Sequence, residues 1–225
     1  MSSDRVKSTG SPEGLVLDMD GTLLDTLEDI RAVVNSVLSQ RGRGTFCLED
    51  YRQGVGSGVE ALLRRLLPKA DSAEIGELAG AVRESYGAAG SPRTRLYDGV
   101  SHLLDAVTAA GIPMAIVTNK PQAAAEQCVK DFLDAWRFGA VIGASPEVPL
   151  KPDPTGALQA AEAMGVRPSS AAYLGDSEVD MRTARAAGML PIGALWGFRN
   201  EETLRKEGAT HLASNPLDVL RVLIP

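Results

Sequence analysis

Short apolar runs recur along the chain, and segments with helical periodicity separate them. Each run has the length of a buried strand and ends at glycine or polar residues. The predicted strands are residues 15–17, 114–117, 140–143, 171–174 and 190–194. The predicted helices between and after them are residues 28–40, 100–110, 122–133, 155–164, 179–187 and 202–206. Strands that alternate with helices in this way predict an α/β fold, with a parallel sheet covered on both faces.

One long block interrupts this alternation after the first strand. Residues 26–92 contain no strand-like run, and residues 48–90 show helical patterns throughout. A single crossover between neighbouring parallel strands does not need so much helical chain. We therefore predict a helical cap domain at residues 26–92, a catalytic core at residues 14–25 and 93–225, and a polar N-terminal tail at residues 1–13.

Composition and charge narrow the range of partners. The 225 residues carry a formal net charge of −6, and no basic stripe is present, so we expect no nucleic-acid partner. No apolar run reaches the ~20 residues needed to cross a membrane, and residues 1–14 lack the pattern of a signal peptide. Cys47 and Cys128 lack metal-ligand spacing, so we expect reduced thiols in a cytoplasmic protein. The sequence leaves open whether the protein is a monomer or a homodimer.

Charged and polar residues follow the predicted strands, beginning with Asp18, Asp20 and Gly21 after the first. Ligands of open α/β sheets bind beyond the carboxyl ends of the strands. Two carboxylates one residue apart can divide the work, one attacking while the other handles a proton. Their repulsion calls for a cation, and Mg²⁺ suits oxygen ligands combined with phosphate. Gly21 would let the backbone approach an anion. The alternative is an acidic helix N-terminus with a capping aspartate.

Later strand ends add four candidates of compatible chemistry. Thr118 supplies a hydroxyl group, and Lys151 is held beside prolines that restrict the backbone. Asp176 is placed as a third metal ligand, and Asp180, one helical turn later, would orient Lys151 or bind the metal through water. Simpler alternatives are caps at Thr118 and Asp176 and an exposed loop lysine at Lys151. Convergence at one rim of the sheet favours a phosphate and metal site.

These residues resemble the haloacid dehalogenase superfamily of hydrolases. The matching motifs are, in order, Asp18-x-Asp20-Gly21-Thr22, Thr118, Lys151-Pro152 and Gly175-Asp176-x-x-x-Asp180. The resemblance covers residues 14–194 and implies a Rossmann-like core with a mobile helical cap. It also implies a phosphoaspartyl intermediate on Asp18, while Asp20 protonates the leaving group and then deprotonates water.

The same resemblance implies the ligand-binding residues. Gly21, Thr118, Asn119 and Lys151 would bind the transferring phosphoryl group. Magnesium would be held by the carboxylates of Asp18 and Asp176 and by the backbone carbonyl of Asp20. Asp180 would lie next to these ligands without binding the metal directly.

A closer resemblance is to phosphoglycolate phosphatase-like members. It lies in Asp25-Thr26-Leu27-Glu28-Asp29-Ile30, Val55-Gly56-Ser57-Gly58 and Tyr97-Asp98-Gly99-Val100. It implies magnesium-dependent hydrolysis of a small phosphorylated metabolite, with phosphoglycolate or a similar acid as one candidate. The alternatives are a β-phosphoglucomutase-like phosphosugar mutase, a pyrophosphatase of the same fold, and a non-catalytic binding protein.

The cap offers two features whose role the sequence leaves open. Gly56 and Gly58 either form a loop that faces the substrate or only a flexible turn before a helix. Arg64 and Arg65 either reach a substrate carboxylate by a bidentate bond or lie on a solvated helix face.

Overall fold

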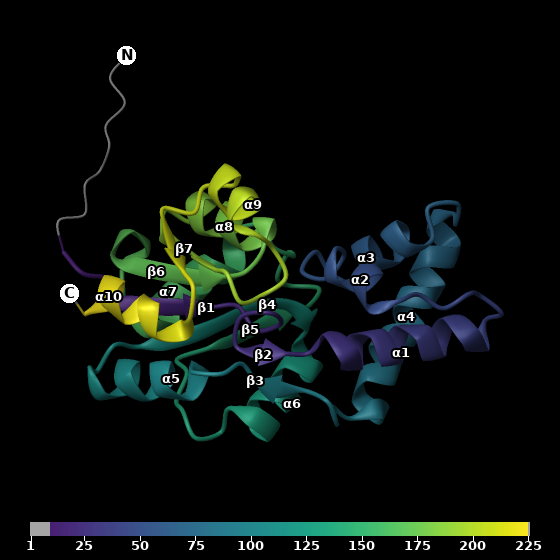
Figure 1. Ribbon diagram of the computed structural model, residues 1–225, viewed down its shortest axis with the longest axis horizontal. Coiled ribbons are helices and arrows are strands. Elements are labelled where there is room, and N and C mark those ends of the chain that lie inside the picture. Colours follow the sequence, from purple (N-terminus) through teal and green to yellow (C-terminus); the bar gives the residue numbers. More distant parts are fainter. Residues whose placement is uncertain (1–9, 225) are drawn as a thin grey trace, which may run out of the picture.

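The computed structural model describes residues 10–224, apart from the side chains of residues 87–89. Within these residues the core is a six-stranded parallel sheet in the order β5-β4-β1-β6-β7-β8, with helices on both faces (Figure 1). The strands are β1 (Gly14–Leu17), β4 (Met114–Pro121), β5 (Val141–Ala144), β6 (Ala171–Gly175), β7 (Leu190–Ala194) and β8 (His211–Ala213). The predicted α/β fold is confirmed. Most of the predicted tail, residues 1–13, lies outside the described residues.

Strand β1 shows why both faces of the sheet are covered. All its residues are buried, and it pairs with β4 on one side and β6 on the other. Leu15 and Leu17 pack into the hydrophobic cluster of one face, and Val16 packs into that of the opposite face. Successive side chains of a strand alternate between the two faces, so a central strand of this kind is apolar at every position.

The helices of the core divide between these two clusters. They are α5 (Val100–Ala109), α6 (Gln122–Phe132), α7 (Thr155–Met164), α8 (Glu178–Ala186), α9 (Glu201–Lys206) and α10 (Leu220–Leu223). Leu103 of α5 and Ala125 of α6 join the cluster of Leu15, whereas Ala157 of α7 and Ala184 of α8 join that of Val16. Figure 1 shows α5 and α6 below the sheet and α8 above it.

The sequence pattern missed strand β8, and the bounds of several other strands differ from the prediction by one residue or more. Residues 140–143 were the prediction for β5, which begins and ends one residue later. β8 pairs with β7 alone and forms an edge of the sheet. Its first residue, His211, is exposed, and only Ala213 is fully buried. Such a short edge strand has no continuous apolar run, so periodicity does not find it.

Helices α1 to α4 form a separate group on the right of Figure 1, here termed the helical unit, residues 27–89. Their bounds are α1 (Leu27–Gln40), α2 (Leu48–Arg52), α3 (Val59–Leu66) and α4 (Ser72–Ala89). They share a hydrophobic cluster of their own, with Val34 and Leu38 from α1, Leu63 from α3 and Ile75 from α4 at its centre. This cluster receives Phe198 from the segment after β7, so the unit is packed against the core.

The helical pattern of residues 48–90 is interrupted at two breaks, of which the second agrees with the predicted start of a helix at Ser72. The first, residues 53–58, contains Gly56 and Gly58 with φ angles of 113° and 89°, which glycine adopts readily. The second ends at Asp71, whose side chain accepts a hydrogen bond of 2.9 Å from the backbone of Glu74 and begins α4. Helical spacing on both sides of a tight turn looks continuous in the sequence.

A short antiparallel ladder joins the helical unit to the core. β2 (Leu24–Asp25) leads into the unit, and β3 (Arg95–Leu96) leads out of it. Leu24 pairs with Leu96, and Asp25 pairs with Arg95. Two-residue strands lie below the length that an alternation pattern can detect, so the sequence did not predict them.

Candidate active site

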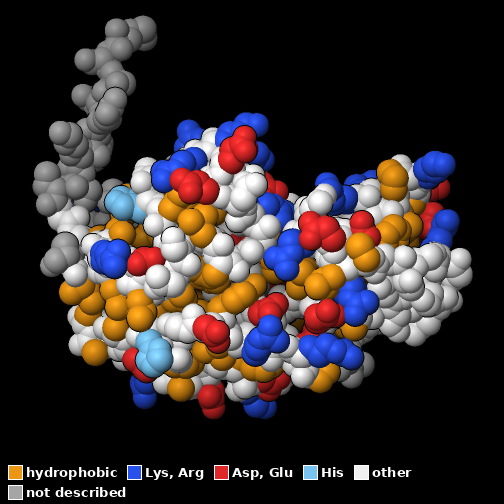
Figure 2. Space-filling view, in the orientation of Figure 1, with side chains coloured by type: hydrophobic (Ala, Val, Ile, Leu, Met, Phe, Trp, Pro, Cys, Tyr) orange, Lys and Arg blue, Asp and Glu red, His pale blue; other side chains and the backbone are white. Residues whose placement is uncertain are grey.

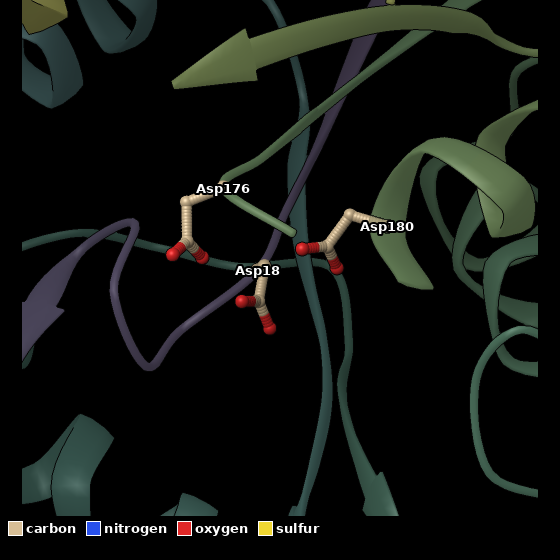
Figure 3. Close-up of side chains that lie close together, drawn as sticks. All are labelled: Asp18, Asp176 and Asp180. Carbon is tan, nitrogen blue, oxygen red and sulfur yellow. The ribbon is translucent and has the colours of Figure 1, made fainter. Parts of the chain in front are cut away.

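Three carboxylates from distant parts of the sequence meet at the carboxyl edge of the sheet (Figure 3). Asp18 directly follows β1, Asp176 directly follows β6, and Asp180 lies in the first turn of α8. Each offers one oxygen to a group whose members lie within 4.8 Å of one another, and all are buried. β1 and β6 are neighbours in the sheet, so their ends place these residues together.

Lys151 lies between two of these carboxylates. Its Nζ donates to Oδ1 of Asp18 and to Oδ1 of Asp180, both at 2.6 Å, and to the carbonyl oxygen of Val117 at 3.1 Å. Burial alone would lower the pKa of Lys151, but Asp18 and Asp180 raise it well above its usual range, so the group stays an ammonium. The alternative of an exposed loop lysine is therefore wrong.

The protein alone does not balance the charge of this group. Ionised Asp18, Asp176 and Asp180 beside the ammonium of Lys151 leave an excess of two negative charges. Burial and then Asp180 raise the pKa of Asp18 well above its usual range and that of Asp176 to about 7. A hard divalent cation with oxygen ligands would supply the missing charge, and this donor set fits such an ion.

Neighbouring donors fix the directions of two of the carboxylates. The hydroxyl of Thr22 donates to Oδ1 of Asp176 at 3.1 Å, and the backbone N–H of Phe198 donates to Oδ2 at 2.7 Å. Oδ2 of Asp180 accepts from the backbone and the hydroxyl of Ser177 at 3.0 and 2.6 Å. Ser177 is the N-cap of α8, so the alternative of Asp176 as a simple cap is wrong.

Gly21 sits where the structure has no room for a side chain. Its φ angle is +92°, and a Cβ atom would collide with the carboxylate of Asp176 and the ring of Phe198. Its N–H donates to the carbonyl oxygen of Leu24 at 2.9 Å and closes the turn after β1. The need for glycine here comes from close approach of the backbone to Asp176, and its predicted contact with phosphate stays a prediction.

Asp20 lies outside this group of three carboxylates and pairs with Lys120. The Nζ of Lys120 lies 2.9 Å from Oδ1 and 3.2 Å from Oδ2 of Asp20, and both side chains are largely buried. The ammonium lies 5.2 Å from the ring centre of Tyr86 in α4. Lys120 was not among the predicted site residues. Its position two residues after Thr118, at the same strand end, was the available signal.

Thr118 and Asn119 occupy the end of β4 beside this pair. Thr118 is buried, and its hydroxyl accepts a hydrogen bond of 3.1 Å from the backbone N–H of Lys120. The Asn119 amide donates to the carbonyl oxygens of Lys151 and Gly56 at 3.1 and 2.9 Å, and its Oδ1 accepts from the N–H of Lys151 at 2.7 Å. Asn119 therefore positions Lys151, and a direct contact with phosphate stays a prediction.

A pocket of about 460 Å³, counting space open to solvent, lies between the core and the helical unit. The core supplies polar walls, among them Asp18, Asp20, Thr118 and Lys120. The helical unit supplies mostly apolar walls, including Ile30, Val59, Leu62 and Tyr86. Gly56 and Gly58 also line it, as expected for a loop that faces the substrate. The space-filling view shows the surface hollowed between the two parts of the molecule (Figure 2).

The arginines considered as carboxylate ligands do not reach this pocket. Arg64 lies 3.5 Å from the hydroxyl of Ser72, and Arg65 bonds Gln53, and both are exposed. The alternative of a solvated helix face is the correct one for both. Basic and acidic side chains are interspersed over the face in Figure 2, and this face shows no basic stripe.

Arg199 connects the core to the end of α2 and to the segment that follows α2. Its guanidinium donates to the carbonyl oxygens of Arg52 and Val55 at 2.6 and 3.1 Å. It also pairs with Glu178 of α8 at 2.7 Å. Together with the bond from Asn119 to Gly56, these contacts hold residues 53–58 over the site.

A family model described as haloacid dehalogenase-like hydrolase matches residues 15–194. The chain belongs to this family. All four motifs of the predicted resemblance lie within the matched range, and the resemblance is confirmed. No helix within residues 10–224 of this hydrolase combines the length and the apolar character needed to span a membrane.

Curated relatives of this haloacid dehalogenase-like hydrolase include phosphoglycolate phosphatases. That of Xylella fastidiosa is 36% identical over 195 residues, covering 87% of this chain and 85% of its own. Phosphoglycolate phosphatase 1 of Pseudomonas aeruginosa is 33% identical over 225 residues, covering 95% and 80%. A crystal structure of a protein from Lactobacillus delbrueckii superposes with a TM-score of 0.88 at 26% identity, covering 95% of this chain and 99% of that chain.

Proposed function

We propose that the protein is a Mg²⁺-dependent phosphatase that hydrolyses a small phosphomonoester through an aspartyl-phosphate intermediate on Asp18. The observation that carries this proposal is the buried group of Asp18, Asp176 and Asp180 around Lys151. Phosphoryl transfer needs in-line positioning and neutralisation of charge, and this group is built for both. Membership of a hydrolase family and relatives named phosphoglycolate phosphatase support it.

In the proposed mechanism, Asp18 attacks phosphorus while Lys151 and Thr118 bind the phosphoryl oxygens. Asp180 holds Lys151 in place from the opposite side, at 2.6 Å. Asp20 donates a proton to the leaving oxygen and then takes one from the attacking water. Water cleaves the acyl phosphate, and inorganic phosphate is released.

The metal ligands in this proposal are the carboxylates of Asp18 and Asp176 and the backbone carbonyl of Asp20. Bound there, Mg²⁺ would neutralise charge on the phosphoryl oxygens and on the nucleophile. The excess of negative charge among the buried carboxylates supports a divalent cation. The choice of magnesium rests on its preference for carboxylate ligands shared with phosphate oxygens.

We propose that residues 26–92 act as a cap that shapes the leaving-group side of the pocket. Their walls are mainly apolar and face the pocket that Asp18 and Asp20 also line. Phosphoglycolate has a small leaving group, and it is the substrate that the names of several relatives give. Free thiols at Cys47 and Cys128 support the proposed cytoplasmic location.

The test is release of phosphate from a panel of phosphomonoesters, with Mg²⁺ or with a chelator. We expect turnover of small phosphate esters that disappears without the metal and in Asp18→Asn. Asp134→Asn changes an exposed aspartate and serves as the matched control. Turnover that survives in Asp18→Asn would refute the proposed nucleophile.

Two further substrates separate the alternatives. Interconversion of sugar phosphates without net release of phosphate would identify a mutase. Preferred cleavage of pyrophosphate would identify a pyrophosphatase. No turnover on the whole panel, together with no Mg²⁺ binding by calorimetry, would leave a non-catalytic protein.

A further inference from the structure

The pair of Lys120 and Asp20 lines the pocket together with Asp18 but lies outside the group of three carboxylates. Lys120 reaches Asp20 from a position 100 residues away in the sequence, with Nζ to oxygen distances of 2.9 and 3.2 Å. Asp18 is bonded to Lys151 instead. In the proposed mechanism Lys151 therefore serves the phosphate site, and Lys120, which lines the pocket beside Asp20, would face the leaving group.

Among the described residues that line the pocket, Lys120 carries the cationic side chain on the leaving-group side. The other nearby cations are committed elsewhere. Lys151 is held between Asp18 and Asp180, and Arg199 is bound to backbone carbonyls and Glu178. Arg64 and Arg65 lie on the exposed surface. An anionic group on the leaving portion of a substrate would therefore meet Lys120.

The surroundings of Lys120 strengthen such a contact. Its ammonium lies against the ring of Tyr86, and the adjoining walls of Ile30, Val59 and Leu62 are apolar. Burial alone would lower the pKa of Lys120, but Asp20 and then Tyr86 raise it above its usual range, so the group stays charged. Charge interactions are stronger for a buried group such as Lys120 than in water.

We propose that Lys120, backed by Tyr86, binds a carboxylate on the leaving group and thereby selects phosphate esters of small hydroxy acids. This inference rests on the proposed phosphatase function and assigns the residue behind its specificity. An ammonium has three donors, so Lys120 can hold a substrate carboxylate while it keeps a bond to Asp20.

The distance between the two side chains limits the length of the substrate. Asp20 would face the ester oxygen and Lys120 the carboxylate, and the two residues are one hydrogen bond apart. Substrate groups bound by two neighbouring side chains lie near each other, so this arrangement favours a short linker between the ester oxygen and the carboxylate. Phosphoglycolate, whose linker is one carbon, has this form.

The test compares two substrates that differ in the carboxylate alone, 2-phosphoglycolate and ethyl phosphate. In Lys120→Met we expect kcat/KM for phosphoglycolate to fall at least about 30-fold more than kcat/KM for ethyl phosphate, mainly through KM, since one charge-assisted hydrogen bond is lost. Lys120→Arg should restore part of the preference. Lys130→Met, at an exposed site on α6, should leave both substrates unchanged.

A second measurement uses inhibition by the two products. Glycolate should compete with the substrate for the free enzyme, and Lys120→Met should weaken this inhibition while inhibition by inorganic phosphate stays the same. Lys120→Gln provides the same comparison if Lys120→Met does not fold. Equal losses for both substrates would overturn the inference and leave the phosphatase function intact. No turnover of either substrate by the unmodified protein would overturn both proposals.

Discussion

Asn119 encloses the backbone of Lys151 with two hydrogen bonds, accepting from its N–H at 2.7 Å and donating to its carbonyl oxygen at 3.1 Å. The side chain of Lys151 then extends to Asp18. The same amide donates to Gly56 of the helical unit. One buried amide therefore couples the position of the lysine to the position of the loop above it.

Asn119→Ala should impair both activity and stability. Loss of these buried hydrogen bonds should lower the free energy of unfolding by about 1–3 kcal/mol. A misplaced Lys151 should lower kcat by about 10-fold or more, because its ammonium no longer lies close enough to stabilise the negative charge of the transition state. Urea unfolding and steady-state kinetics measure the two effects.

Asn200→Ala is the matched control for this variant. Asn200 caps α9 by accepting a hydrogen bond of 3.0 Å from the backbone N–H of Thr203, and it does not line the pocket. Its loss should cost about 1 kcal/mol of stability and leave kcat unchanged. If Asn119→Ala behaves in the same way, Asn119 has only a structural role.

Metal binding and stability should both depend on pH through Asp176. Its pKa is raised from 3.8 to about 7 in the folded protein, by burial first and then by Asp180. A raised pKa means that the folded state favours the protonated form, so the metal-free protein should lose stability as the pH rises from about 4 to 7. Mg²⁺ must displace this proton, so its affinity should rise over the same range.

Thermal unfolding with a chelator and with Mg²⁺, from pH 5 to 8, tests this dependence. Asp176→Asn should be more stable than the unmodified protein at pH 8 without metal, and Mg²⁺ should no longer stabilise it. A stability profile that is the same for both proteins would show that Asp176 does not titrate in this range.

Arg199→Ala should loosen the helical unit from the core. The arginine loses its bonds to Arg52 and Val55 and its ion pair with Glu178. We expect a higher KM and faster proteolysis within residues 53–58, because the loop is then held by fewer contacts. Arg182→Ala, which breaks an exposed pair with Glu207 within the core, should change neither measurement.

Gly21→Ala should abolish metal binding and activity. The new methyl group collides with Asp176 and Phe198, and the φ angle of +92° disfavours any other residue. Gly165→Ala is the control, since Gly165 also has a positive φ, of +69°, but no atom lies within 4 Å of the added Cβ. It should cost about 1 kcal/mol of stability and leave Mg²⁺ binding by calorimetry unchanged.

The sequence was sufficient for the parts of the fold that burial alone determines. Val16 and its neighbours form a strand that is apolar at every position, and the strands on either side contain similar apolar runs at residues 114–117 and 171–174. β8 and the ladder of β2 with β3 are short and partly exposed, so they carry no such pattern. Their formation depends on partners that are distant in the sequence.

The same distinction applies to the site. Strand ends placed Asp18 and Asp176 at one rim, because the topology of a parallel sheet sets where its strands end. The pairing of Lys120 with Asp20 and the contacts of Arg199 depend on side-chain directions across two separate parts of the fold. Neither spacing nor composition encodes those directions, so the sequence alone did not reveal these contacts.

The ladder of β2 and β3 limits how the helical unit can move. Both passages of the chain between core and unit run through it, and they are hydrogen-bonded to each other. We expect a connection of this kind to act as a single hinge, about which the unit would rotate as one body once the contacts of Asn119 and Arg199 open. Substrate entry and phosphate release would then share one gate, so a change at the ladder should alter both rates together.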